Sequence, residues 1–225
     1  MKHSAFAHFA RVGLSSLALV LSGSVAHADG GWVVEKEQGG IRVSQQQTGA
    51  ENEVTRGQMK IAATVEAVAA LLDDIEACPR WVHNCIEAKR IETPDQAHRL
   101  DYTVIKMPVL LQDRDMYIGS ESHYDPTTQT LSVTLTGKDH YDNGQKGRTR
   151  MLGLKGSWVI QQVTPKQAQV DYEIYVNPQV SLGDSANSHL VVSVFETLRK
   201  MREVVKDEKY RNATFSDEFL KAAAP

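Results

Sequence analysis

The residues with the clearest capacity for polar chemistry are Asp113, Arg114 and Asp115, which directly follow a loop over 107–112. The proline of this loop has no backbone N–H to donate, so it ends any strand that precedes it. An arginine that turns inward needs an anionic or hydrogen-bonding partner. The pattern fits either a buried hairpin corner with a surface ion pair or a gate over an apolar cavity with Arg114 as its polar anchor. The gate residues would be Met107, Pro108, Val109, Leu110 and Leu111.

No other motif points to catalysis or to a metal. The sequence contains no Gly-x-Ser-x-Gly elbow, no glycine-rich phosphate loop and no His-x-x-x-His pair. His123, His140 and His189 fall on a predicted strand, a polar loop and a helix start. At such places a histidine is more often solvated or satisfied than catalytic. We therefore expect no catalytic residues, no metal and no cofactor.

The two cysteines, Cys78 and Cys85, stand seven residues apart in Cys-Pro-Arg-Trp-Val-His-Asn-Cys. A continuous helix would hold them about 10 Å apart, which is beyond the reach of a disulfide. Pro79 indicates a break in any helix here, so the spacing leaves a disulfide open. His83 lies between the cysteines, but one histidine and two cysteines at this spacing match no common zinc site.

The first 28 residues have the pattern of a secretory signal peptide. Lys2 and Arg11 supply a basic start, residues 12–20 an apolar stretch, and Ala26-His27-Ala28 a small-residue cleavage site. Residues 29–225 would then form a single exported domain, most simply in a periplasm, where a disulfide can form. The chain carries a formal charge of −3 without a basic stripe, so no nucleic-acid partner is expected.

Hydrophobic periodicity predicts a mixed domain with strands before and after one early helical region. Strands are expected over 41–44 and 54–62, and Thr64 should cap a helix over 65–75. A shorter helical turn follows Pro79. From residue 86 the period changes to two, which predicts an antiparallel meander over 86–91, 99–106, 113–124, 130–136, 147–154, 157–163 and 169–176.

A long amphipathic helix over about 184–209 completes the domain. Its apolar positions recur at the spacing of one helical face: Leu190, Val191, Val194, Phe195, Leu198, Met201 and Val205. A sheet of this length must twist, and it can curl around that helix. Periodicity does not decide whether side chains fill the space between helix and sheet or leave a cavity.

Two blocks of residues resemble the START (steroidogenic acute regulatory protein-related lipid transfer) family, and in particular its bacterial members. The first is the tryptophan-bearing segment 78–85; the second places Tyr102, Pro108 and Arg114 in that order and separation. Gly156-Ser-Trp158 and Asn177-Pro178 also fit, and the resemblance covers 32–209. The segment 177–183 lacks the Asp-Pro-Gly-Gly and Pro-Trp pattern often found there, which bears on the tunnel rim rather than the fold.

The resemblance implies an α+β helix-grip fold with an internal hydrophobic tunnel. The loop 107–112 and the last helix would form its gate, and Arg114 would point inward to pair with Asp101. Strand alternation then sends Met116, Ile118 and Ser120 inward as well, together with Thr103 and Ile105, while Asp113 and Asp115 face outward. The expected ligand contacts are Arg114, Asp101, Tyr102, Met116, Ile118, Trp81 and Leu198.

The implied function is to bind one hydrophobic molecule, a lipid, and to transfer it in the periplasm through transient membrane contact. We expect a monomer without enzymatic activity. The alternative is an enzyme like the aromatase/cyclases, which share the helix-grip fold and act on a polyketide in the cavity. A third interpretation is an interaction module whose tunnel is filled by its own methionines. Sterol, phospholipid, fatty acid, isoprenoid quinone and hopanoid are all compatible with the sequence.

Overall fold

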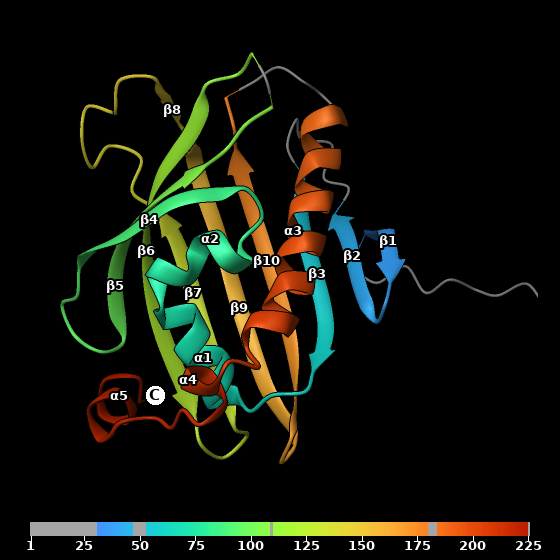
Figure 1. Cartoon of the computed structure of the whole chain (residues 1–225), viewed down its shortest axis with the longest axis vertical. Coiled ribbons are helices and arrows are strands. Elements are labelled where there is room, and N and C mark those ends of the chain that lie inside the picture. The colour runs from blue at the N-terminus through green and yellow to red at the C-terminus, as the bar shows by residue number, and fades with distance from the viewer. Residues whose placement is uncertain (1–30, 47–52, 109, 180–183, 225) are drawn as a thin grey trace, which may run out of the picture.

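The computed structural model describes residues 31–46, 53–108, 110–179 and 184–224, apart from the side chains of 184–186 (Figure 1). One curved sheet and a long helix dominate the molecule. The predicted signal peptide and its cleavage site lie outside the described residues, as does Val109. Within the described part, no helix is long and apolar enough to cross a membrane.

The sheet has ten strands in the order β1-β2-β3-β10-β9-β7-β6-β5-β4, with β8 beside β6. All pairs are antiparallel except β6 with β8. The strands are β1 (Trp32–Gln38), β2 (Ile41–Gln46), β3 (Val54–Ile61), β4 (Cys85–Glu92), β5 (His98–Ile105), β6 (Asp113–Asp125), β7 (Thr130–Gly137), β8 (Arg148–Arg150), β9 (Leu152–Thr164) and β10 (Gln167–Asn177). Strand β3 pairs with β10, the last strand in the sequence. The first three strands of the chain therefore lie at the edge of the sheet next to β10.

The helices lie in front of the sheet in Figure 1. Thr64 caps α1 (Val65–Asp73) by accepting a hydrogen bond from the Ala67 amide, as predicted. The early region continues with the 3₁₀ turn η1 (Ile75–Ala77) and α2 (Cys78–Trp81). The C-terminal part holds α3 (Asp184–Val204), α4 (Glu208–Arg211) and α5 (Asp217–Ala222).

The long final helix is confirmed, but it ends at Val204 rather than near Lys209. The chain turns after Val204 because Tyr210 folds back into the core, where its hydroxyl donates to Asp74 over 2.7 Å. The predicted apolar face is buried at Val191, Val194, Phe195, Leu198, Met201 and Val205. This face grips the sheet at Gly57, where a Cβ atom would lie 2.6 Å from Leu198 Cδ1. The helix-grip architecture is therefore present.

The prediction of two strands over 147–154 and 157–163 with a turn between them was wrong. The chain instead forms the short β8 and then one long strand, β9. Gly153 takes a positive φ of 63° next to a register shift in the β9–β10 pairing. At Gly156 a Cβ atom would lie 2.6 Å from the carbonyl oxygen of Glu173. These glycines serve a bulge and a close approach of two strands, not a turn.

Candidate functional site: a cavity under the sheet

An apolar cavity of about 200 Å³ lies between the curved sheet and helices α2 and α3. An outer hollow of about 340 Å³ adjoins this cavity. The two spaces share the walls His83, Ile105, Met151, Val176, Leu190 and Ser193. The inner cavity is lined mainly by carbon atoms, from residues such as Trp81, Ile105, Met116, Ile118, Trp158 and Leu190. A mostly apolar hollow with a few polar groups is the usual form of a small-molecule site.

Strand alternation placed most of the inner wall correctly. Met116, Ile118 and Ser120 on β6 line the cavity, and so do Thr103 and Ile105 on β5. Trp81 also lies in the wall, where its ring meets Trp158 edge-on with 6.0 Å between the ring centroids. Trp158 in turn stacks on Tyr172 at 3.8 Å, and burial raises the pKa of the Tyr172 hydroxyl.

The predicted ion pair between Arg114 and Asp101 was wrong. Sheet register pairs Asp101 with Ile118 and Arg114 with Ile105, so the two side chains stand about 13 Å apart along β6. Arg114 is 3% exposed and is not a wall of the inner cavity. Its Nε donates to the carbonyl of Pro178 over 2.8 Å and its Nη1 to the carbonyl of Gln112. Arg114 therefore ties the loop 107–112 to the end of β10.

Arg99 is the inward arginine that the sequence analysis missed. It lines the cavity beside Asp101 and is 9% exposed. Its Nη1 donates to Asp73 over 2.5 Å and its Nε to Ser120 Oγ over 3.3 Å. The signal was present, because Arg99 and Asp101 lie two residues apart on one strand and so share a face.

Asp101 accepts a hydrogen bond from Arg90 Nε over 2.5 Å. Burial raises the pKa of the Asp101 carboxyl, and although Arg90 acts in the opposite direction, the net pKa lies above its ordinary value. Together with Arg99, Thr103 and Ser120, Asp101 gives one end of the apolar cavity a compact polar wall.

Two predicted ligand contacts lie elsewhere. Tyr102 faces the opposite side of the sheet, where its hydroxyl donates to Asp115 over 3.1 Å and accepts from Arg148 over 2.7 Å. Leu198 is fully buried between α3 and the sheet and does not line the cavity. Asp115 lies on the outer face as predicted, yet it is only 1% exposed because Arg150 covers it with a 2.9 Å ion pair.

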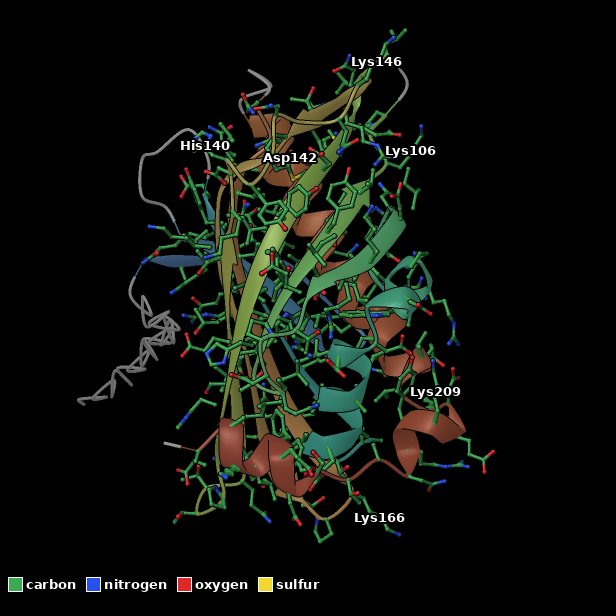
Figure 2. The ribbon with its side chains drawn as sticks, turned by 90° about the vertical axis from the view of Figure 1, so that its left-hand side faces the viewer. Lys106, His140, Asp142, Lys146, Lys166 and Lys209 are labelled. Atoms are coloured by element: carbon green, nitrogen blue, oxygen red, sulfur yellow. A yellow bond between two sulfur atoms is a disulfide. The ribbon has the colours of Figure 1, made fainter. Side chains whose placement is uncertain are left out.

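The outer hollow forms a mouth between the loop 107–112 and the start of α3. Met107 and Pro108 line it, and Lys106, His83 and His189 supply basic side chains. Leu110 is 98% exposed and holds a positive φ of 81°, an uncommon conformation for a residue with a side chain. Figure 2 shows Lys106 at the upper end of the molecule, next to this loop. An exposed leucine on strained backbone is typical of a segment that changes its contacts.

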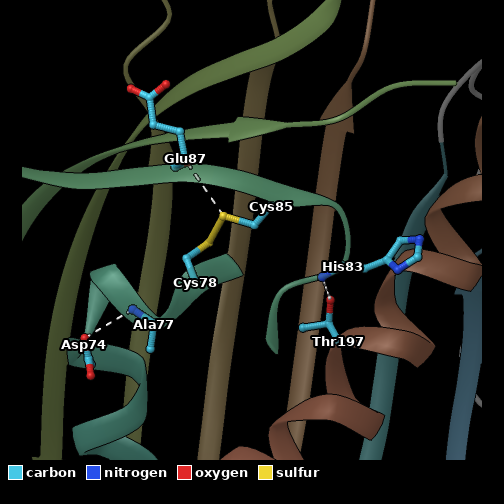
Figure 3. The surroundings of a disulfide bond; sticks show 7 residues. All are labelled: Asp74, Ala77, Cys78, His83, Cys85, Glu87 and Thr197. Carbon is cyan, nitrogen blue, oxygen red and sulfur yellow. Dashed lines mark hydrogen bonds between the residues drawn. A yellow bond between two sulfur atoms is a disulfide. The ribbon is translucent and has the colours of Figure 1, made fainter. Parts of the chain in front are cut away.

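Cys78 and Cys85 form a disulfide, which settles the pairing that their spacing left open (Figure 3). Helix α2 ends at Trp81, and the chain then reverses, which brings the two Cα atoms to 6.0 Å. The bond fastens α2 to β4, and Cys78 itself lines the cavity. The reversing segment is also held to α3 by the His83 amide, which donates to Thr197 Oγ1 over 3.0 Å. No group of three His, Cys, Asp or Glu residues within the described ranges is arranged to hold a metal.

Comparison with known proteins places the chain in one family. The sequence profile of the START domain matches residues 15–211. An uncharacterized protein of Pseudomonas aeruginosa, PA1579, is 27% identical over 179 residues, which cover 78% of this chain and 87% of that protein.

Solved structures share the fold at lower identity. The STAR-related lipid transfer protein of Xanthomonas axonopodis (fragment 25–204) has a TM-score of 0.72 at 22% identity, covering 79% of this chain and 99% of that one. Human STARD10 has a TM-score of 0.70 at 20% identity, covering 80% and 74%. Human StAR-related lipid transfer protein 5 has a TM-score of 0.70 at 16% identity, covering 79% and 88%. The chain belongs to the START domain family.

Proposed function

We propose that this START domain binds one lipid in its cavity and carries it between membranes in an exported compartment. The observation that carries the proposal is the apolar cavity, which shares walls with a mouth at the start of α3. Related proteins of the same fold are named for lipid transfer. Burial of an acyl chain or ring system contributes about 25 cal/mol per Å² of apolar surface, which can supply most of the affinity.

The polar end of the ligand would lie against Asp101, Thr103 and Arg99, and its apolar part against Trp81, Met116 and Ile118. This assigns the anchoring role to the polar wall rather than to Arg114. Arg114 would instead hold the gate, since it bonds to carbonyl groups on both sides of the mouth. A ligand could leave when the loop 107–112 moves from α3, with Leu110 and Pro108 in contact with a membrane.

We also propose that the domain is a monomeric carrier and not an enzyme. The ionisable groups of the polar wall are held in structural pairs, Asp101 with Arg90 and Arg99 with Asp73. Export rests on the sequence of residues 1–28 and is tested by the mass of the secreted protein. Cleavage after Ala28 would give a product that begins at Asp29.

The deciding experiment is native mass spectrometry of protein purified without detergent, followed by extraction of bound material. We expect a stoichiometric hydrophobic adduct, which also names the lipid class. A bare protein that stays bare after incubation with a lipid extract would contradict the carrier function. Chemical turnover of the extracted molecule would favour the cyclase-like enzyme instead.

Membrane contact is tested separately with Leu110→Asp. A charged side chain at this exposed position should slow transfer between vesicles while leaving equilibrium binding unchanged. The matched control is Val163→Asp, which places the same charge at another exposed apolar residue, at the far end of β9. Equal transfer rates for Leu110→Asp and the wild type would remove the membrane-contact role.

A further inference from the structure

A second hollow of about 190 Å³ adjoins the cavity on the side away from the mouth. It lies between α1, β6, β7 and the C-terminal segment, which comprises residues 212–224. Leu72, Arg99 and Val133 line both this hollow and the cavity. The two spaces therefore share a wall that consists of these three side chains.

The outer wall of this second hollow is the C-terminal segment. Phe215 packs on Tyr124 with 4.6 Å between ring centroids and on Phe219 at 4.8 Å. The Tyr124 amide donates to the carbonyl of Ala223 over 2.8 Å. Figure 1 shows α5 at the opposite end of the molecule from the loop between β5 and β6. The segment lies outside residues 15–211, which match the START domain.

The attachment of the C-terminal segment changes abruptly along the chain. Just before it, Tyr210 and Lys209 both bond to Asp74, and Arg80 pairs with Asp207 over 2.6 Å. After residue 212, the described chain makes no ion pair or side-chain hydrogen bond to the body, and α5 itself contains no buried residue. The segment is held by the aromatic packing, by the buried Ala223 and by the backbone hydrogen bond of Ala223 to Tyr124. Segments with few buried contacts open at low free-energy cost while the rest of a domain stays folded. The anchored α4 can therefore serve as the fixed side of a hinge.

The wall between the second hollow and the cavity can also rearrange, because Arg99 is weakly held in it. Arg99 is held there by Asp73, whose side chain is 61% exposed, and by a long 3.3 Å hydrogen bond to Ser120. An ion pair with a solvent-exposed partner exchanges readily with water. The second hollow contains further polar groups from Glu66, Gln96 and Ser122, which suit a hydrated passage rather than a packed core.

We propose that the C-terminal segment is a lid over a second port, through which an apolar ligand reaches the cavity from the end opposite the mouth. Opening lifts Phe215 from Tyr124, together with Phe219, which stacks on Phe215, and lets Arg99 swing toward solvent with Asp73. The proposal rests on the proposed ligand-binding function, to which it adds a route of exchange. It predicts that the lid, and not only the mouth loop, sets the rate at which ligand enters and leaves.

The first test measures exchange of N-phenyl-1-naphthylamine, a neutral apolar fluorophore, by stopped-flow fluorescence. Phe215→Ala/Phe219→Ala should raise the association and dissociation rates about tenfold, because the aromatic contacts that close the lid are lost. The matched control is Leu220→Ala, which removes an apolar side chain from the outer surface of the same short helix. Rates that equal the wild type in the double variant would overturn the port.

The second test needs no ligand and so separates the port from the binding function. In Val133→Cys the introduced thiol is the only free one in the described chain, because Cys78 and Cys85 are bonded. Methyl methanethiosulfonate should modify it about tenfold faster when the aromatic pair is removed, and no faster with Leu220→Ala.

If Phe215→Ala/Phe219→Ala does not fold, Phe215→Leu/Phe219→Leu keeps more of the apolar volume and still removes both aromatic rings. Equal labelling rates with and without the aromatic pair would overturn the proposal. Faster labelling in a protein that binds no fluorophore would support the port and contradict the lipid-binding function. If the variant binds the fluorophore but its labelling and exchange rates are unchanged, the ligand-binding function is supported and the port is contradicted.

Discussion

Strands β5 and β6 present alternate residues to two faces of the sheet. The outer face is filled by packed side chains, whereas the inner face borders a cavity. On the outer face, Tyr102 and Asp115 belong to a packed network of hydrogen bonds and ion pairs with Arg148 and Arg150. On the inner face, Asp101, Thr103 and Met116 border an open cavity. Strand alternation assigns each residue to a face of the sheet. The segment that covers a face decides whether side chains pack against that face or leave a cavity.

The outer face is filled because the region around β8 brings its own side chains. Arg150 reaches Asp115 and also Asp142, at 2.9 and 2.7 Å. The Arg150 guanidinium holds the pKa of Asp142 well below its usual range, with a further contribution from the Tyr117 hydroxyl. Burial, and next the hydrogen bond to Asp142, raise the pKa of Tyr117 to about 12. The inner face is covered by α2 and α3, whose side chains leave a space between them.

The strongest test of this contrast is Asp115→Ala, which removes the centre of the outer network. We expect a loss of about 3 kcal/mol in the free energy of unfolding, since Arg150 stays buried with only part of its charge compensated. Urea unfolding measures the loss. Glu37→Ala is the control, because its ion pair with Arg42 is more than half exposed and should contribute less than about 1 kcal/mol. A similar small loss for Asp115→Ala would show that the outer face is not a cooperative network.

Removal of the disulfide tests whether this bond holds α2 in place beside the cavity on the inner face. Cys78→Ala/Cys85→Ala should lower the free energy of unfolding by about 2–3 kcal/mol, the value for a short closed loop. It should also weaken fluorophore binding, because α2 carries Trp81 in the cavity wall. Wild-type protein unfolded in the presence of a reductant should match the variant. If the variant keeps the wild-type unfolding midpoint and affinity, packing alone holds α2 in place.

A matched pair of enlargements compares the faces directly. Val104→Phe inserts a ring on the outer face, where Val104 is fully buried, and should cost about 1–3 kcal/mol through overpacking. Ile118→Phe inserts a ring on the inner face, where the cavity can receive it, and should cost less than about 1 kcal/mol. Fluorophore binding should fail in Ile118→Phe and persist in Val104→Phe. The opposite pattern would place the ligand site on the wrong face.

Much of the fold could be predicted from local patterns. The Thr64 cap, the apolar face of α3 and the inward set on β6 all follow from short-range periodicity. The strand break around Gly153 could not, because a glycine in a bulge or a close approach has the same sequence signal as a glycine in a turn. The C-terminal helix α5 could not be predicted either, because it has only six residues and its sequence shows no apolar repeat.

The site was predicted less completely because it depends on register. Alternation correctly placed Asp101 and Arg114 on one face, yet it contains no information about their separation along the strands. That separation follows from the pairing of Asp101 with Ile118, which is a long-range property of the sheet. The same alternation, applied two residues before Asp101 on β5, identifies Arg99 as the inward arginine near Asp101. Tyr102 could have been excluded on the same ground, since it lies between two inward residues.

The smallest expected effect compares two histidines that lie on opposite faces. His83 lines the cavity, where burial and then Lys200 lower its pKa. His98 lies on the outer face, where the hydrogen bond to Asp95 raises its pKa. An unfolded histidine titrates near pH 6.5, so acidification below that value adds protons to the unfolded chain before it protonates His83. Stability contributed by neutral His83 is therefore present above pH 6.5 and lost as the pH falls toward its folded pKa.

His98 has the opposite sign. Its stabilising pair with Asp95 is present below pH 6.5 and is lost as the pH rises through the raised folded pKa. Urea unfolding between pH 5 and pH 8 gives the free energy of unfolding as a function of pH. Below pH 6.5 this free energy should depend less on pH in His83→Gln than in the wild type. Above pH 6.5 it should depend less on pH in His98→Gln than in the wild type. The His98 effect should be the weaker, since that side chain is 44% exposed. Identical profiles in both variants and the wild type would mean that the cavity wall around His83 is as hydrated as the outer surface.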